Sequence, residues 1–247
     1  MLEYHCFIDN DHVSLLFRTL VDAESLALRH WMVTNREIKN ELYEQVSRIA
    51  KASASPKRLE LLGLLCQAPK TVEMLSQEAS ISVKLASSHL QDLKASRLVE
   101  SERHGKNMIY KLASSSVANF LVTLRELALE RLTELQEAVR QLGESAHEWT
   151  GTTRDELLQQ AGSGDVVVID VRPANEFESA HIPYARSMPL SELKARLKEL
   201  PKGKKIVAYC RGPFCLMSDD AVRLLRKSGY DAVLLRDGIV EWNRRAG

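Results

Sequence analysis

Apolar residues near the start of the chain recur at the spacing of amphipathic helices. Along residues 36–49, and again along residues 59–65, an apolar side chain returns every three or four positions. This is the period of a helix that buries one face. Ser55 and Pro56 offer the second helix an N-cap and a first-turn proline. The pattern therefore predicts two helices in this region.

Two further helices and a hairpin follow. Thr71 can cap a short helix, and after a turn the helical period resumes over residues 83–93. Beyond Leu98 the apolar period changes to two as far as Leu112, and a polar stretch containing Gly105 interrupts it. That change predicts a two-stranded hairpin with a glycine-bearing tip. The order of these elements is typical of a winged helix-turn-helix.

A long apolar stripe comes next. Its members recur every three or four residues after a serine run that can cap a helix. They are Val117, Leu121, Leu124, Ala128, Leu132, Leu135, Val139 and Leu142. The stripe predicts one long helix whose apolar face forms a homodimer seam, because a small wing domain cannot cover it fully. The alternative is that the stripe packs only on its own chain.

The second half of the chain has a different pattern. Thr153 and Glu156 form a capping box, and residues 166–170 are a short apolar run of the kind that forms a buried strand. The sequence predicts strands at residues 166–170, about 186–188, 205–209 and 232–235, alternating with helices at residues 191–200 and 216–228. This alternation predicts an α/β fold with a mostly parallel sheet, in which ligands bind at the carboxyl ends of strands.

These patterns divide the chain into two domains and an extension. We predict an N-terminal extension of unclear role at residues 1–34 and a mainly α winged helix-turn-helix with a long dimerisation helix at residues 35–148. An α/β domain follows at residues 149–247, after a linker at residues 143–151.

Composition is that of a soluble globular protein, with 45% hydrophobic and 27% charged residues among 247. No segment has the length and apolar character of a membrane span or a secretory signal, so we expect a cytoplasmic protein without a membrane partner. In that compartment the four cysteines are expected to be free, catalytic or redox-active rather than a disulfide framework.

The formal net charge of +1 conceals a basic middle block. Residues 36–112 carry 13 Lys and Arg against 9 Asp and Glu, whereas residues 113–152 carry 3 against 6. A surplus of this size permits nucleic-acid binding without demanding it.

The winged-helix region resembles the ArsR-type repressors. The resemblance covers roughly residues 40–112 and rests on Ala86-Ser-Ser-His-Leu-Gln-Asp-Leu93, Arg97-Leu-Val99 and the hairpin from Arg103 to Leu112. It implies that the helix bearing Ser-Ser-His enters the major groove of an operator DNA and that the wing touches the backbone. The implied DNA-binding residues are Lys84, Ser87, Ser88, His89 and Gln91 on the helix, and Arg103 and Lys106 on the wing. Taken alone, the serines could be surface residues and His89 a core histidine.

Many ArsR-type proteins sense metals, which requires N or S ligands that converge on one site. The family's Cys-x-Cys is absent from residues 67–73, and the long helix has no Cys and no His before His147. We therefore expect no metal site, and the sequence indicates no cofactor. Cys66 resembles the first cysteine of the persulfide-sensing branch of the family, whose second cysteine is missing. It is a candidate regulatory thiol, or simply a small buried apolar residue.

Cys210 is the candidate nucleophile. It follows an apolar strand and precedes a tight Gly-Pro loop and a helix start. Loop N–H groups and the positive end of a helix dipole favour thiolate over thiol at such a position. A cysteine loop that transfers phosphoryl groups needs an arginine six positions after the cysteine, and this chain has Leu216 there. Phosphatase chemistry is therefore disfavoured, and a pure interaction module would lack the cysteine.

Residues 153–247 resemble a single rhodanese domain. Motifs at residues 169–177, 181–183, 210–215 and 237–242 occur in the family's order. The resemblance implies sulfurtransferase activity, in which Cys210 takes sulfur from a small sulfane-sulfur donor to form a persulfide, and the outer sulfur then passes to a thiol acceptor. The loop residues Arg211, Gly212, Phe214 and Cys215 would stabilise the anionic persulfide.

Three further residues belong to this prediction. Asp170 and Arg172 are expected to form a structural ion pair at a strand end rather than an acid/base pair, and Cys215 is either a half-buried residue or a resolving thiol.

Two functions remain open from the sequence. The first is a dimeric DNA-binding regulator whose rhodanese domain forms a Cys210 persulfide and senses or handles reactive sulfur. The second is primarily a thiosulfate or persulfide sulfurtransferase whose winged helix serves dimerisation or autoregulation.

Overall fold

The computed structural model describes residues 34–143 and 153–244. The predicted extension and nearly all of the predicted linker lie outside these ranges. The chain divides into two compact units, residues 1–51 and 52–247. In the first unit the described residues are helical, as predicted, and the helix runs over residues 34–53. Its exposed large apolar side chains are Ile38, Leu42, Tyr43, Val46 and Ile49.

The second unit begins with the winged helix-turn-helix, which the sequence predicted. Its elements are α2 (Pro56–Leu65), β1 (Lys70–Thr71), α3 (Val72–Glu78), α4 (Val83–Ala95), β2 (Val99–His104) and β3 (Asn107–Leu112). Pro56 stands in the first turn of α2, and Thr71 caps α3 by accepting a hydrogen bond from the Met74 N–H. Ser82 caps α4 in the same way, so side chains set the start of both helices of the motif.

The hairpin joins a three-stranded antiparallel sheet of order β1-β3-β2. His104 pairs with Asn107 across the tip, where Gly105 has a φ of 60°. Strand β1, which the apolar pattern did not predict, pairs Lys70 with Tyr110. Buried leucines of α2, α3 and α4 pack against Tyr110 to form one core.

The long stripe does not form one helix, so the prediction of a continuous helix is wrong, while the prediction that its apolar face forms a homodimer seam stays a prediction. Helix α5 (Ser115–Arg131) ends where Leu132 adopts an extended backbone with φ −109° and ψ 105°, and α6 (Thr133–Gly143) follows. The Gln136 amide donates hydrogen bonds to the carbonyl of Leu129 at 2.7 Å and to that of Glu130. These bonds satisfy acceptors that the break leaves open. The apolar period does not reveal this break, because the same repeat continues on both sides of it.

The α/β half follows the predicted alternation. Its elements are α7 (Arg154–Ser163), β4 (Val166–Asp170), α8 (Ala174–Ser179), β5 (Arg186–Ser187), α9 (Leu190–Arg196), a 3-10 turn (Leu197–Glu199), β6 (Lys205–Tyr209), α10 (Met217–Lys227), β7 (Ala232–Leu234) and α11 (Ile239–Arg244). The capping box of Thr153 and Glu156 is present. Helices α8 and α11, six residues each, were too short for the apolar pattern to predict.

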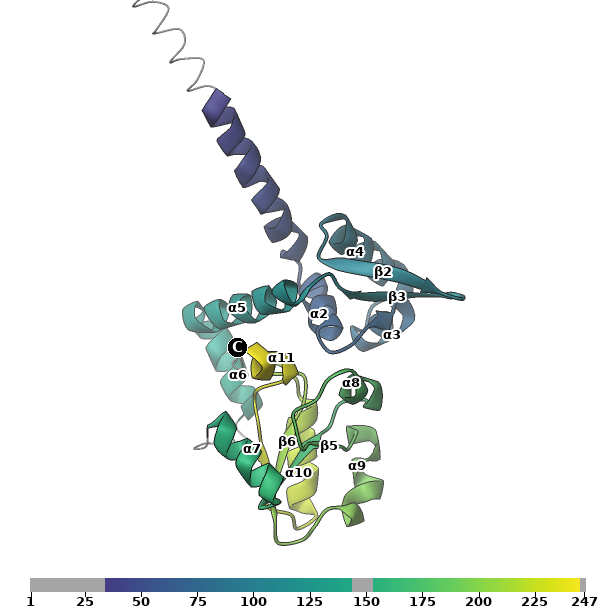
Figure 1. Cartoon of the computed structure of the whole chain (residues 1–247), viewed down its shortest axis with the longest axis vertical. Coiled ribbons are helices and arrows are strands. Elements are labelled where there is room, and N and C mark those ends of the chain that lie inside the picture. Colours follow the sequence, from purple (N-terminus) through teal and green to yellow (C-terminus); the bar gives the residue numbers. More distant parts are fainter. Residues whose placement is uncertain (1–33, 144–152, 245–247) are drawn as a thin grey trace, which may run out of the picture. The chain divides into compact units, whose positions relative to one another are not determined.

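All neighbouring strands of this four-stranded sheet are parallel, in the order β5-β4-β6-β7. Helices α9 and α10 lie on one side of the sheet and α7 on the other (Figure 1). Apolar residues of α9 and α10 belong to the core on the first face, and those of α7 and α11 to the core on the second. Both faces are therefore covered, which explains why the inner strands are apolar without alternation. Asp170 and Cys210 stand at the carboxyl ends of the two central strands.

Within the described ranges, no helix is both long enough and apolar enough to cross a membrane.

Candidate functional site

Cys210 lies where the sequence placed it, directly after β6 and before the loop that leads into α10. Its side chain is 2% exposed and belongs to the apolar core of the sheet. The Sγ atom lies 3.1 Å from the Ser218 hydroxyl and 3.6 Å from the carbonyl of Cys215. A thiol in this position is shielded from water and contacts a hydroxyl that can donate to it.

Two glycines allow the loop to close over Cys210. Gly212 has a φ of 122°, and a Cβ there would lie 3.0 Å from the Glu241 carboxylate. A Cβ on Gly238 would lie 2.6 Å from the backbone of Arg211 and Gly212. Side chains at either position would push the loop out of place. The Asp237-Gly238 motif, far along the chain, is thus a support of the cysteine loop.

The two loop thiols influence each other's protonation, and the pKa shifts of the two differ in direction. Burial raises the pKa of Cys210 well above its ordinary value. A hydrogen bond from the Cys210 thiol lowers the pKa of Cys215 to about 7, despite burial, and the N–H groups of Arg211 and Met217 add to this effect. Backbone N–H groups act on both sulfurs, because that of Ser218 lowers the pKa of Cys210 while those of Arg211 and Met217 lower the pKa of Cys215. Which of the two carries the reactive thiolate stays a prediction.

This difference predicts the order of alkylation of the two thiols. Iodoacetamide is expected to modify Cys215 first, with a rate that rises through about pH 7 because the thiolate forms as the pH passes the pKa of Cys215. Cys210 should react later and only at higher pH. Mass spectrometry of peptides after timed alkylation measures both rates. Faster modification of Cys210 at neutral pH would contradict this assignment.

Arg211 does not point its guanidinium at Cys210. It donates hydrogen bonds to the buried carboxylate of Glu176 and to Glu78 of α3. The Lys70 ammonium, whose side chain is fully buried, lies between the same two carboxylates at 2.7 and 2.8 Å. Both carboxylates hold the Arg211 side chain in this state, and its role in stabilising a Cys210 persulfide stays a prediction. Two cations and two carboxylates form a network that joins the cysteine loop to the helix-turn-helix.

The predicted ion pair of Asp170 and Arg172 is present and fully buried. Arg172 Nε donates to both carboxylate oxygens at 2.9 and 3.1 Å, and Nη2 approaches Oδ2 at 2.6 Å. The remaining donors of Arg172 reach the side chain of Gln67 at 2.9 Å and the carbonyl of Ala180 at 2.7 Å. All these donors have partners, so the pair is built as a scaffold. Through Gln67 it also contacts the end of α2.

Cys66 lies at the same junction, in a different setting. It is half-buried, and burial raises its pKa to about 12, opposed by the charge of Arg125 and reinforced by that of Glu241. Arg125 of α5 donates to Glu241 at 2.7 Å, and Arg244 donates to Glu126 at 2.7 Å. Cys66 is therefore a protonated thiol at neutral pH in this state, which is a poor acceptor of sulfur.

The predicted DNA-binding residues lie on α4 and the wing. Lys84, Ser88 and Gln91 are exposed, and Ser87 and His89 are half-buried. The Gln91 amide donates to the Tyr110 hydroxyl at 3.1 Å. Arg103 and Lys106 are exposed at the hairpin tip, where Arg103 Nε donates to the carbonyl of Gly105 at 3.2 Å. Their contact with DNA stays a prediction.

Sequence reasoning missed the residues that surround the loop from other elements. They are Ser218, Gln67, Lys70, Glu78, Arg125 and Glu241. Ser218 could have been suspected from its place in the first turn of α10. Glu241 lies in the motif at residues 237–242, but its pairing with Arg125 could not be foreseen. The remaining residues come from segments up to 144 residues distant in sequence from their partners, and no local pattern marks them. In the part of the chain that the structure describes, no group of three or more His, Cys, Asp or Glu could hold a metal ion.

Comparison with known proteins agrees with this architecture. Residues 55–101 match the family described as bacterial regulatory protein, arsR family, and residues 153–245 match the rhodanese-like domain. A protein named sulfurtransferase from Allochromatium vinosum is 36% identical over 34% of this chain and 78% of its own length. A winged helix-turn-helix fragment of Mb0332 from Mycobacterium bovis is 35% identical, covers 39% of this chain and 89% of that one, and superposes with a TM-score of 0.37.

One relative spans nearly the whole chain. The HTH-type transcriptional regulator Rv0324 of Mycobacterium tuberculosis is 38% identical over 216 residues, which are 87% of this chain and 94% of that protein. The alignment includes both halves of the molecule. The chain therefore belongs to the ArsR-type helix-turn-helix transcriptional regulators, and it carries a C-terminal rhodanese-like domain.

Proposed function

We propose that this regulator binds an operator as a homodimer and that sulfane sulfur carried on Cys210 lowers its affinity for DNA. The observation that carries the proposal is the placement of Arg211. It follows the candidate nucleophile directly in sequence, and its guanidinium donates a hydrogen bond to the Glu78 carboxylate at the end of α3. A change at the thiol therefore acts on a residue that is already attached to the helix-turn-helix.

The chemical step is the transfer of one sulfur atom. The Cys210 sulfur attacks the outer sulfur of thiosulfate, the bond between the two donor sulfurs breaks, and sulfite leaves with the bonding electron pair. The Cys210 proton passes to the Cys215 thiolate, which already accepts a hydrogen bond from it. The product is a persulfide anion on Cys210. A thiol acceptor can then take the outer sulfur and regenerate the cysteine.

The persulfide would act on the ion network. A new anion and an extra sulfur atom enter a site where Cys210 is only 2% exposed, so the loop must shift to accommodate them. The anion also competes with Glu78 for the Arg211 guanidinium. Because α3 packs against α4 in one core, release of Glu78 from Arg211 would shift α3 and with it the position of α4, the recognition helix.

DNA binding would use the exposed face of α4 and the wing. Lys84, Arg103 and Lys106 would contact phosphates, and Ser88, His89 and Gln91 base edges or phosphates. Affinity is then expected to fall steeply with salt, because phosphate contacts release counterions.

A second copy of the chain would cover the apolar face of the helix at residues 34–53. Leu42 and Val46 are 62% and 68% exposed there, next to Ile38 and Ile49 on the same face. Changing both Leu42 and Val46 to lysine is expected to lower the dimer association constant by about a hundredfold or more. Sedimentation velocity over a concentration series measures this constant. Asn40→Lys, on the opposite side of the helix, is the matched control, and an undiminished dimer in the double variant would contradict the proposal.

The chemistry is tested by mass spectrometry of the purified protein after exposure to thiosulfate or polysulfide. We expect one added sulfur on Cys210, with some on Cys215 and none on Cys66. A sulfurtransferase without DNA control is the second candidate, and the similarity to the Allochromatium vinosum sulfurtransferase favours it. Sulfur loading that leaves DNA affinity unchanged would select this second function. Absence of sulfur on Cys210 with every donor would contradict both.

A further inference from the structure

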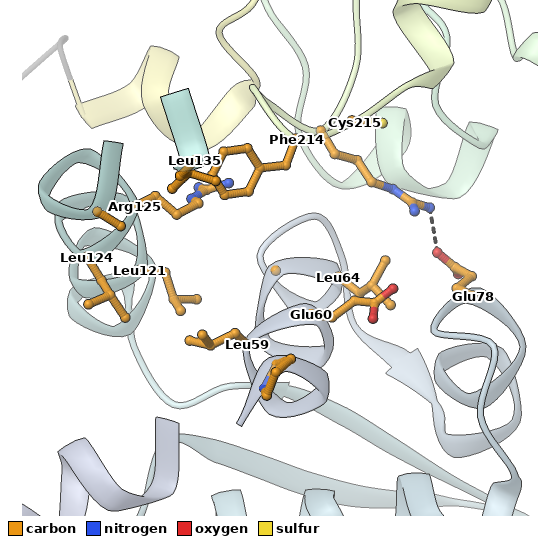
Figure 2. A pocket seen from close by; sticks show the side chains of 14 residues that line it. Leu59, Glu60, Leu64, Glu78, Leu121, Leu124, Arg125, Leu135, Phe214 and Cys215 are labelled. Carbon is orange, nitrogen blue, oxygen red and sulfur yellow. Dashed lines mark hydrogen bonds and ion pairs between the residues drawn. The ribbon is translucent and has the colours of Figure 1, made fainter. Parts of the chain in front are cut away.

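A cavity of about 550 Å³ lies beside the cysteine loop, and its wall includes Leu121, Leu124 and Leu135 (Figure 2). These leucines belong to the apolar stripe that is predicted to form the homodimer seam, so a second copy of the chain is the expected occupant. Another cavity, of about 330 Å³, is built entirely from residues of the α/β domain. Its volume is within the range of sites that bind small molecules, about 300–1,000 Å³.

This smaller cavity lies at the opposite end of the sheet from Cys210. Val166, the first residue of β4, and Lys204, the residue before β6, belong to its wall, and Ala161 and Leu200 add apolar surface. Cys210 follows the last residue of β6, so the length of a five-residue strand, about 16 Å, separates the two ends. The cavity is therefore remote from the cysteine loop, and the sulfur chemistry does not account for it.

Three cationic side chains belong to the wall of this cavity. They are Arg186 of β5, Lys198 of the 3-10 turn and Lys204. In the part of the chain that the structure describes, neither Arg186 nor Lys198 pairs with a carboxylate. Lys204 donates a hydrogen bond to the carbonyl of Gly164, which holds the ammonium at the wall and leaves two further N–H donors for a ligand. The cavity therefore presents positive charge from three separate segments.

The carboxylate that lines this cavity is already neutralised. Glu199 accepts hydrogen bonds from Nε and Nη2 of Arg196, both at 2.9 Å. A bound dianion would balance more of the remaining positive charge than a monoanion. The fork of an arginine matches the geometry of a phosphate, and lysines bind phosphates as point charges. The charges therefore favour a phosphate group.

Tyr184 adds a flat apolar surface to the same wall. Its φ of 66° is left-handed, which costs free energy for a residue with a side chain. A Cβ at Gly162 would lie 3.5 Å from the ring, so the ring packs against α7, yet Tyr184 is 65% exposed. Residues strained in this way cluster at ligand-binding sites. An exposed aromatic ring at a cavity wall can stack on a flat ring of a ligand.

We propose that this cavity binds a small phosphate ester that carries a flat ring, of the nucleoside monophosphate class. Arg186, Lys198 and Lys204 hold the phosphate, and the ring of the ligand stacks on Tyr184. The site is independent of the sulfur chemistry, because none of these residues belongs to the cysteine loop. It gives the α/β domain a second ligand, remote from Cys210.

Titration calorimetry of the full-length protein with adenosine monophosphate tests the site. We expect a dissociation constant at least about tenfold lower than those of inorganic phosphate and of adenosine, because only the nucleotide contacts both the cations and the ring. Equal affinity for inorganic phosphate would show that the ring contributes nothing and would overturn the proposal. Absence of binding by the adenosine, guanosine, cytidine and uridine monophosphates alike would also overturn it.

Charge variants locate the phosphate. Changing both Arg186 and Lys198 to glutamine should raise the dissociation constant of the nucleotide by about tenfold or more. Changing both Lys194 and Lys227 to glutamine is the matched control, because it removes the same charge from exposed residues that do not line the cavity. Unaltered nucleotide affinity in the first double variant would place the site elsewhere and contradict the proposal.

Tyr184→Gly isolates the contribution of the ring. Glycine adopts the left-handed backbone freely, so we expect the free energy of unfolding to be unchanged or higher, while the dissociation constant of the nucleotide rises by about tenfold. Urea unfolding and calorimetry measure the two quantities. Undiminished affinity in this variant would overturn the stacking role. If the wild type binds no nucleotide and the double variant at Arg186 and Lys198 binds operator DNA less tightly, these cations contact the DNA backbone and the proposal is wrong.

Discussion

Cys210→Ser is expected to lower the rate of sulfur loading from thiosulfate by at least about a thousandfold. The hydroxyl of serine is far less acidic than a thiol, and the neighbouring Cys215, whose pKa is about 7, is too weak a base to deprotonate it. Only a sulfur atom can form the persulfide bond. Rapid-quench mass spectrometry, with sulfite release measured in parallel, gives the rate for both proteins.

The neighbouring cysteines supply the comparison for this prediction. Cys215→Ser removes the proton acceptor and should slow loading without abolishing it. Cys66→Ser should leave loading unchanged, because Cys66 remains a thiol with a pKa raised to about 12 by burial. If Cys210→Ser still accumulates sulfur on Cys215 at the wild-type rate, Cys210 is not the nucleophile.

Glu176→Gln is expected to lower the free energy of unfolding by about 3–5 kcal/mol. The carboxylate is fully buried and accepts from Lys70 and Arg211. Without its charge, two cations remain at the junction with only Glu78 to balance them. Urea unfolding followed by circular dichroism measures the loss. Glu192→Gln is the matched control, because Glu192 is exposed and pairs with Arg196 on the surface, where such pairs contribute little.

The same carboxylate predicts how stability depends on pH. Burial alone would raise the pKa of Glu176, but hydrogen bonds from Arg211 and Lys70 outweigh it and lower the pKa below its ordinary 4.5. A carboxylate whose pKa is lower in the folded state stabilises the fold at pH values above its unfolded pKa. That contribution is lost as the pH falls through the folded pKa. The difference between wild type and Glu176→Gln should therefore shrink below about pH 4.5. A constant difference down to pH 2 would contradict the assignment.

Local patterns predicted most of the fold because the apolar period and the capping residues of a short segment indicate each helix or strand. The strand at 205–209 and the capping box at Thr153 follow from period and capping chemistry alone. The break at Leu132 could not be foreseen, since the apolar repeat crosses it without a change. Cys210 and the Asp170–Arg172 pair were found because their chemistry lies within short motifs.

The junction between the two halves was beyond the reach of the sequence. Lys70 and Glu78 look like ordinary surface charges along the chain, yet they meet Glu176 and Arg211 from more than 100 residues away. Such pairs depend on how two finished domains pack. The influence of burial on the pKa of Cys210, and of backbone N–H groups on the pKa of Cys215, could not be foreseen either, because both arise only in the folded loop.

The coupling between sulfur and DNA is the central claim, and fluorescence anisotropy of a labelled operator tests it. The duplex is selected from a random pool with the unloaded protein, and its affinity is measured before and after polysulfide treatment. We predict that sulfur on Cys210 weakens binding of the wild type by about tenfold or more, while Cys210→Ser keeps its affinity. Equal affinity of loaded and unloaded wild-type protein, or the same release from Cys210→Ser, would contradict it.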